Sequence, residues 1–320
     1  MAKFSYPGSV GLAPMAGITD RAFRTVCRLW GAQFFFTEMI SAESVLLELT
    51  VVERMLPSAD EKDTAVQLYG SEPRKLALAA KKIQHHASWI DLNAACPVKK
   101  VVKKNAGAAL LRDLNRLGDI VKAMKDACEK PVTVKVRLGF EKNELEKIME
   151  TLIFAGVDGV EVHGRTAVQM YSGKAEWNLQ LDRWNVPTAI SGDLFTVEDI
   201  KKALEVSKSK AAIVARGALR KPWIFSEIQY GSEPSVEEIR DMFLFHTRML
   251  RKQEGEKSFY KLRQFVMGYT HGFANARKFR EAFMKLEKFE SIEHAIQEFF
   301  NHFLMNAEEN MSVKEDGAKA

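Results

Sequence analysis

The chain has few cysteines and no long apolar run. Its 320 residues contain three cysteines, Cys27, Cys96 and Cys128, which are odd in number and far apart in the sequence. This pattern argues against a disulfide framework and does not match the spacing of zinc ligands. The sequence also has no run of about 18 apolar residues and no secretory signal at its N-terminus. We therefore expect a cytoplasmic protein with no membrane segment and no metal site.

Three common ligand-binding motifs are also missing. There is no GxGxxG, no GxxxxGK[ST] and no HExxH, which argues against a Rossmann dinucleotide site, a P-loop and a zinc protease. The composition is 46% hydrophobic and 28% charged, and the net charge is +5. Such a chain can bury a real core. Its length suits one large α/β barrel plus a smaller domain, or two or three ordinary domains.

Short β-branched runs alternate with helical patterns as far as about residue 230. Strands are predicted near 10–13, 34–38, 65–68, 89–93, 132–136, 159–163, 188–190 and 212–215. Helices are predicted near 20–30, 42–49, 73–86, 114–129, 143–155, 197–206 and 222–228. This alternation fits an open doubly wound sheet or a closed barrel, and the count of eight strands favours a (β/α)₈ TIM barrel over residues 1–230.

The pattern changes after Tyr230. Residues 231–235 read as a linker, and helices are predicted near 236–253, 258–270, 274–288 and 292–305. We expect a small all-helical domain over 231–307 and a frayed polar tail over 308–320. Between Arg240 and Lys288 there are twelve basic and five acidic residues. This excess indicates either the solvated face of ordinary helices or a phosphate-binding surface.

A barrel of this kind carries its chemistry at the carboxyl ends of its strands. The polar residues expected there include Gln67, Asn93, Cys96, Lys135 and His163. A lysine inside an apolar strand needs a compensating anion or a lowered pKa. Taken singly, the histidine could be a satisfied core residue and the cysteine an inert one. Together they predict a reactive site at one rim.

The loops after the last two predicted strands suggest a phosphate site. Gly192 and Gly217 let backbone N–H groups approach a ligand closely, and Arg216 adds a positive charge. Loops at these positions commonly bind phosphate in TIM barrels. We therefore expect a phosphorylated cofactor across the barrel mouth.

A basic loop follows Cys96 and Pro97. It carries Lys99, Lys100, Lys103 and Lys104. A thiol at the end of a strand beside four lysines indicates proton chemistry on a polyanion. The alternative from this segment alone is a buried cysteine before a turn proline.

The ordered motifs together resemble the tRNA-dihydrouridine synthase family. They are Ala13-Pro14-Met15-Ala16-Gly17, Asn93-x-x-Cys96-Pro97, Lys135-x-Arg137-x-Gly139, and the stretch from His163-Gly164-Arg165-Thr166 to Trp177. The resemblance runs from about Leu12 to about Lys288. It implies an FMN-dependent enzyme that reduces specific uridines in the D-loop of tRNA.

The resemblance also implies roles for single residues. FMN would be bound by Pro14, Met15, Ala16, Gln67, Lys135, His163, Ser191, Gly192, Asp193, Ala215 and Arg216. The catalytic set would be Cys96, Asn93, Lys135 and His163. RNA would be bound by Lys99, Lys100, Lys103, Lys104, Arg137, Arg165, Arg277 and Arg280. The chain departs from the family at Ser191, at Ala215, and at Gln264-Phe265, where a Lys-His pair is common.

The mechanistic hypothesis is reduction of the uracil C5–C6 double bond. Reduced FMN gives hydride from N5 to C6, and Cys96 gives a proton to C5. NADPH or NADH would reduce the flavin, tRNA would be the partner, and the chain would act as a monomer. Two rivals remain from the sequence: an FMN barrel that reduces a free pyrimidine, and an RNA-binding barrel that has lost catalysis.

Overall fold

The computed structural model describes residues 4–317, with side chains described as far as Met305. The chain divides into two compact units. The first contains the residues up to 28 together with 32–217, and the second contains 29–31 together with the residues from 218 onward. The boundary therefore falls before the linker predicted at 231–235, which lies within the second unit.

The first unit is a closed parallel β-barrel. Among its described residues, the strands are β1 (Val10–Leu12), β2 (Phe35–Phe36), β3 (Ile40–Ser41), β4 (Thr64–Tyr69), β5 (Trp89–Ala94), β6 (Val132–Arg137), β7 (Gly159–His163), β8 (Thr188–Ser191) and β9 (Ala211–Val214). Strand β2 pairs with both β1 and β4, and this closes a ring of eight strands. The additional short strand, β3, pairs only with β4. The predicted TIM barrel is confirmed.

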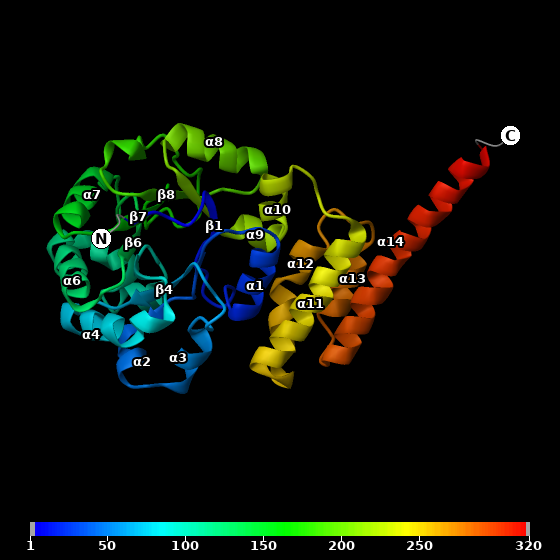
Figure 1. Ribbon diagram of the computed structural model, residues 1–320, viewed down its shortest axis with the longest axis horizontal. Coiled ribbons are helices and arrows are strands. Elements are labelled where there is room, and N and C mark those ends of the chain that lie inside the picture. Colours follow the sequence, from blue (N-terminus) through cyan, green and yellow to red (C-terminus); the bar gives the residue numbers. More distant parts are fainter. Residues whose placement is uncertain (1–3, 318–320) are drawn as a thin grey trace. The chain divides into compact units, whose positions relative to one another are not determined.

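Helices surround the strands of the barrel (Figure 1). They are α1 (Arg21–Leu29), α2 (Ala42–Leu46), α3 (Thr50–Met55), α4 (Pro73–Ile83), α5 (Lys99–Val102), α6 (Leu114–Ala127), α7 (Leu145–Phe154) and α8 (Val197–Ser207), with short 3₁₀ turns at Gln84–His86, Gly107–Arg112 and Leu181–Arg183. Local sequence explains several starts. Pro73 occupies the first turn of α4, and Thr196 and Asp199 form a capping box on α8.

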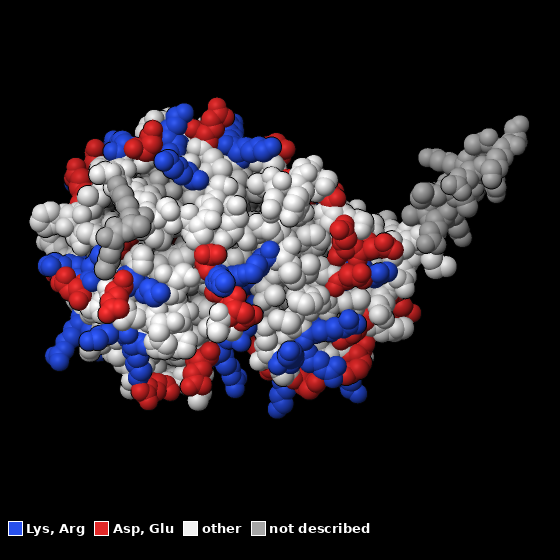
Figure 2. Space-filling view, viewed as in Figure 1, with Lys and Arg blue, Asp and Glu red and all other residues white. Residues whose placement is uncertain are grey.

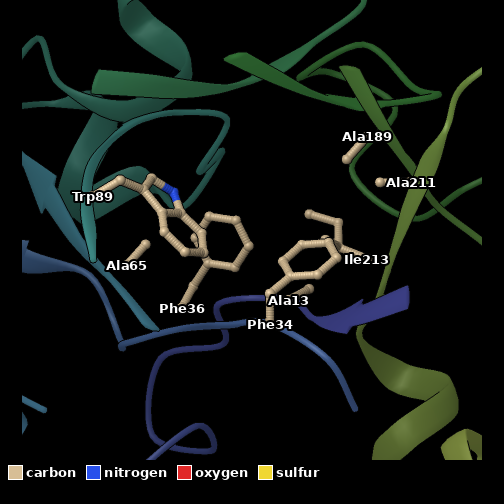
Figure 3. Close-up of a cluster of buried hydrophobic side chains, with 8 residues drawn as sticks. All are labelled: Ala13, Phe34, Phe36, Ala65, Trp89, Ala189, Ala211 and Ile213. Carbon is tan, nitrogen blue, oxygen red and sulfur yellow. The ribbon is translucent and has the colours of Figure 1, made fainter. Parts of the chain in front are cut away.

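Aromatic side chains fill one end of the barrel interior. Figure 3 shows the cluster, in which Phe34, Phe36 and Trp89 meet small residues of the neighbouring strands. The rings of Phe36 and Trp89 are nearly perpendicular, with centroids 5.7 Å apart. Phe4 and Tyr6, from the N-terminal segment, pack against the same cluster. This end of the barrel is therefore a solid core.

Alternation along each strand places chemically different side chains at successive levels of the barrel interior. Side chains two residues apart on a strand share a face, so β5 turns Trp89, Asp91 and Asn93 inward at successive levels. Strand β6 does the same with Thr133 and Lys135. The interior thus changes from an aromatic core, through a layer of buried polar groups, to the reactive groups at the mouth.

The second unit is helical over its described residues. It contains the end of α9 (Arg216–Arg220), α10 (Ile224–Tyr230), α11 (Val236–Glu254), the 3₁₀ helix η4 (Glu256–Gln264), α12 (Val266–Tyr269), α13 (Ala276–Phe283) and α14 (Phe289–Gly317). Helices α11 and α14 lie side by side (Figure 1). The expected frayed segment 308–320 is helical as far as Gly317, and 318–320 lie outside the described residues. The glutamates and the lysine of this segment are good helix formers.

Two contacts explain why residues 218–230 belong with the helical unit. The indole rings of Trp223 and Trp30 meet edge to face, with centroids 6.5 Å apart. Gly268 in α12 approaches the carbonyl of Leu219 so closely that any side chain at position 268 would collide with it. Packing, rather than the Gly-Ser-Pro linker composition, therefore sets the boundary.

Candidate functional site

Strand register brings the predicted site residues together at the carboxyl ends of the strands. Asn93 on β5 is level with Lys135 on β6, which is level with Glu161 on β7. One step further along, Arg137 is level with His163, and His163 is level with Ser191 on β8. The parallel barrel therefore gathers polar side chains that are widely separated in the sequence.

Cys96 is held by the turn that follows β5. The Asn93 carboxamide oxygen accepts hydrogen bonds from the N–H of Cys96 at 2.9 Å and from the N–H of Ala95 at 3.2 Å. The Cys96 carbonyl accepts from Ala108 N–H, and Gly107 (φ 61°) leaves room for this approach. Burial raises the thiol pKa, against the opposing effects of the Val98 N–H and nearby cations. The thiol therefore stays protonated at neutral pH.

A chain of side-chain hydrogen bonds runs below Asn93. The Asn93 amide donates to Gln67 Oε1 at 2.8 Å, and Gln67 Nε2 donates to Asp91 Oδ2 at 2.7 Å. Thr133 donates to the other Asp91 oxygen at 2.8 Å, and Tyr6 donates to Glu161 Oε1 at 2.7 Å. Burial raises the pKa of both carboxyl groups, and the mutual repulsion raises that of Asp91 further.

Sequence reasoning did not assign roles to Tyr6, Asp91, Thr133 or Glu161. The available signal was an acidic residue between apolar residues in two predicted strands, Ile90-Asp91-Leu92 and Val160-Glu161-Val162. Such an acid needs buried hydrogen-bond donors. The same argument that identified Lys135 would therefore have identified these two carboxyl groups.

The pKa values of Lys135 and His163 are both lowered from their ordinary values. Burial, followed by repulsion from Arg137, lowers the Lys135 pKa to about 8. Its ammonium group donates to Ser191 Oγ at 3.5 Å. Burial and nearby cations, Lys135 first among them, lower the His163 pKa well below its usual value. His163 is therefore a neutral imidazole at neutral pH.

Asp193 forms a brace between two arginines. Its carboxylate pairs with Arg165 at 2.5 Å and Arg216 at 3.1 Å, and it accepts from Ala175 N–H at 2.9 Å. Burial alone would raise its pKa, but these donors lower it. The Asp193 carboxylate is therefore occupied by donors of the chain itself, and its expected role in binding the cofactor stays a prediction.

The guanidinium groups of Arg137 and Arg165 donate hydrogen bonds to backbone carbonyl groups of loops. Arg165 is 1% exposed and donates to the carbonyls of Ser172 and Gly173. Arg137 donates to the carbonyls of Ala95, Thr166 and Met170, and burial lowers its pKa to about 10. Both side chains are buried, and their expected role in binding the RNA backbone stays a prediction.

The segment Pro14–Ala16 lies on the opposite side of the mouth. It is a turn after β1, in which the hydroxyl of Thr19 accepts from Met15 N–H at 3.0 Å. Gly17 takes a positive φ of 76°, and its N–H donates to Glu38. Pro14 and Met15 are half-buried and Ala16 is exposed, so the turn offers an apolar edge to a ligand. The link to Glu38 was not predicted.

Several buried donors at the ends of β7, β8 and β9 fit a phosphorylated flavin. His163 Nε2 and Arg165 Nη1 are buried and make no hydrogen bond within the described part of the chain. Gly192 takes a φ of 111°, and a side chain there would collide with Ala175. Unmet donors beside a glycine backbone suit an anionic ligand with polar ring edges.

Ser191, Ala215 and Arg216 complete that side of the mouth. The Ser191 hydroxyl donates to the Val162 carbonyl at 3.3 Å, so it is available to Lys135 as an acceptor. The Ala215 side chain packs on the aromatic core, which leaves its backbone for contact with a ligand. The Arg216 guanidinium lies 4.7 Å from the centre of the Tyr171 ring, at an exposed edge.

The residues predicted to bind RNA are split between the two units. Helix α5 and the two residues that follow it carry Lys99, Lys100, Lys103 and Lys104, which are all exposed, and among the described residues they form no ion pair. In the second unit, Arg277 is exposed and pairs with Glu281. Arg277, Lys278 and Arg280 line a surface depression of about 560 Å³ around the α12–α13 turn.

The other two cysteines are placed as structural residues. Cys27 is fully buried in α1, and burial raises its pKa. Cys128 is half-buried at the end of α6 and donates to Gln84 Oε1 at 3.3 Å. Neither lies among the polar groups at the ends of the strands, so Cys96 stands apart from the other thiols.

Comparison with known proteins agrees with this geometry. The family model described as dihydrouridine synthase (Dus) matches residues 11–307. The chain belongs to the dihydrouridine synthase family. It is 35% identical to a probable tRNA-dihydrouridine synthase of Rickettsia bellii over 90% of this chain and 94% of that protein.

Two further relatives support the assignment. The chain is 31% identical to tRNA-dihydrouridine synthase B of Pseudomonas aeruginosa, over 93% of this chain and 94% of the relative. It is 34% identical to tRNA-dihydrouridine synthase B of Vibrio cholerae, over 91% and 95%. Enzymes of this family are flavin-dependent oxidoreductases that reduce uridine to dihydrouridine in tRNA.

Two kinds of feature are absent from the described residues. No helix among them is both long and apolar enough to cross a membrane. Over the same residues there is no group of three or more His, Cys, Asp or Glu side chains that could hold a metal ion.

Proposed function

We propose that this chain reduces the C5–C6 double bond of uridine in tRNA, with Cys96 as proton donor and FMN bound across the barrel mouth. The observation that carries the proposal is the half-buried thiol that follows β5, next to the strand that carries the buried cations Lys135 and Arg137. Membership in a family whose enzymes reduce uridine in tRNA supports the choice of substrate.

The cofactor would be held by residues on both sides of the mouth. Pro14, Met15 and Ala16 would lie along the ring, and Gln67 and Lys135 would bind its polar edge. Ser191, Gly192, Ala215 and Arg216 would hold the ribityl chain and phosphate, and His163 would donate its unmet N–H. Reduced FMN, when bound, supplies hydride to C6 of the base, and NADPH or NADH restores the reduced flavin.

Cys96 would then deliver a proton to C5. A thiol suits this step because its ordinary pKa of about 8.5 already keeps it protonated near neutral pH, and burial raises the pKa further. Asn93 fixes the backbone of Cys96 by accepting its N–H. Lys135 would stabilise the negative charge that develops on the uracil oxygens, because a cation in a water-excluded site acts strongly on such charge.

The tRNA backbone would be held by two basic surfaces. One is formed by the four exposed lysines on and beside α5, directly after the catalytic loop, and the other by Arg277 and Arg280 in the helical unit. The target uridine must leave its stack to reach the mouth. Base flipping costs a few kcal/mol, and phosphate contacts can offset that cost.

Mapping of dihydrouridine tests this function. Unmodified tRNA is incubated with the protein, FMN and either NADPH or NADH, and the positions that gain two hydrogens are located by mass spectrometry. We expect dihydrouridine at defined D-loop positions. Reduction of free uridine with no product on tRNA would replace the proposal with a small-molecule reductase. A colourless protein that takes up no FMN would overturn the flavin site.

A further inference from the structure

The middle layer of the barrel contains two carboxyl groups that the proposed reaction does not use. Asp91 on β5 and Glu161 on β7 are both 0% exposed, and their side chains lie within hydrogen-bonding reach of each other. Lys135 is the cation whose charge acts on both. Two ionised carboxylates facing one ammonium group would leave a buried, uncompensated negative charge, which is strongly unfavourable.

Within the described chain, the hydrogen bonds leave one of the four carboxyl oxygens of this pair without a donor. Asp91 accepts from Gln67 on one oxygen and from Thr133 on the other, and Glu161 Oε1 accepts from Tyr6. The fourth oxygen, Glu161 Oε2, is buried and makes no hydrogen bond within the described chain. A proton on that oxygen, donated to Asp91, would satisfy it and leave a single negative charge opposite Lys135.

Asp91 also sets the direction of the hydrogen-bond chain above it. Because a carboxylate only accepts, Gln67 must point its NH₂ down and its oxygen up. The Gln67 oxygen then accepts from Asn93, which leaves the Asn93 oxygen free to accept from Cys96 N–H. Reversal of the Gln67 amide would present NH₂ to NH₂ and break this order.

We propose that Asp91 and Glu161 share one buried proton and act as a positioning pair, which orients the Gln67 and Asn93 amides and through them the loop that carries Cys96. The inference rests on the proposed roles of Cys96 and Asn93. In the proposed site, Asp91 and Glu161 would contact neither the substrate nor the cofactor. Their effect on turnover passes through the hydrogen-bond chain, which ends at the reactive loop.

Two substitutions at Glu161 separate the possibilities. Glu161→Gln keeps a donor at Oε2 and an acceptor for Tyr6, and it has the charge of a protonated glutamic acid. Glu161→Leu removes both. We expect Glu161→Leu to lower kcat by about 10- to 100-fold, because small displacements of reacting groups have effects of that size. Glu161→Gln should restore kcat to within about threefold of wild type, with KM for tRNA unchanged in both.

Asp91→Leu tests the other half of the pair. It removes the acceptor that orients Gln67, so kcat should fall as in Glu161→Leu. Thermal unfolding and far-ultraviolet circular dichroism are measured for every variant. If either leucine variant does not fold, Glu161→Gln decides, because an ionised Glu161 predicts a large loss in that variant and a protonated one predicts a small loss.

Infrared spectroscopy of the FMN-loaded protein gives a readout independent of turnover. At neutral pH the wild type should show a C=O stretch from a protonated carboxyl group, and Glu161→Gln should lack it. Absence of the band in wild type, with a Glu161→Gln defect as severe as that of Glu161→Leu, would overturn the shared proton. Leucine variants with wild-type kcat would overturn the positioning role. Failure of wild type to modify tRNA would instead overturn the proposed function, and the infrared result would still report on the pair.

Discussion

At the scale of single residues, the thiol of Cys96 is the group on which the proposed reaction most depends. A positioned general acid contributes about 10²–10⁴ in rate. We expect Cys96→Ala to lower kcat by about that factor and to leave FMN affinity unchanged, measured by single-turnover kinetics and flavin titration. The matched control is Cys128→Ala, since Cys128 lies at the end of α6. Equal turnover in wild type and Cys96→Ala would remove the thiol from the mechanism.

Lys135 should leave a signature in the pH dependence of stability. Its pKa is lowered from 10.5 to about 8 in the folded protein. Between these values the unfolded chain binds the proton and the folded chain does not, so the free energy of unfolding rises with pH. Wild type relative to Lys135→Met should therefore gain up to about 3 kcal/mol across this window in urea titrations. Parallel pH curves for the two proteins would contradict the lowered pKa.

The site residues that the sequence could identify are those at unusual positions in it. Cys96 and Asn93 stand out because a proline ends their strand, and Lys135 because it interrupts an apolar run. The pairing of Asp193 with Arg165 could not be predicted, because it joins the loops that follow β7 and β8. Loop conformation depends on packing, and the sequence pattern carries little information about it.

At the scale of elements, α5 links the catalytic loop to a basic surface. We expect the change of Lys99, Lys100, Lys103 and Lys104 to glutamine to weaken tRNA binding and to reduce the slope of log K against log salt by roughly 3. Four exposed lysines on and after α8 provide a matched control: Lys201, Lys202, Lys208 and Lys210. Equal weakening by both sets in filter-binding titrations would show a nonspecific effect of charge.

Helices and strands were predicted where a hydrophobic pattern extends over several residues, and they were missed where the pattern spans only a few. The eight barrel strands were predicted because each lies in a run of several apolar or β-branched residues, as the short strand β2 does in Phe34-Phe35-Phe36. Strand β3 has two residues, Ile40–Ser41, too few to show alternation. Helix α5 has four, of which two are lysines. The single helix predicted over 42–49 ends early because Glu48 adopts a positive φ of 54°.

At the scale of the whole molecule, net charge alone does not account for RNA binding. On the face shown in Figure 2, basic and acidic side chains are intermingled. Affinity should therefore come from local clusters such as α5. We expect the Kd for tRNA to rise by about 10³- to 10⁵-fold between about 50 mM and about 200 mM salt if 6–10 phosphates are contacted. A Kd that changes little over this range would indicate binding without the phosphate backbone.

The division into units was predicted only in outline. The sequence showed a helical region after the barrel, because strand patterns stop near residue 215. It did not show that residues 218–230 pack with that region, since their membership depends on contacts such as that between Trp223 and Trp30. Composition marks a flexible link, but the packing of distant side chains decides where a compact unit begins.

The aromatic core at one end of the cylinder also constrains the order of events. Phe34, Phe36 and Trp89 are buried and fill that end of the barrel. In the proposed reaction, a nicotinamide and a nucleobase would therefore both reach the flavin through the barrel mouth. The oxidised nicotinamide would have to leave the site before the nucleobase could bind there. Steady-state turnover with both substrates varied should then give parallel double-reciprocal lines, whereas intersecting lines would mean that the two are accommodated at once.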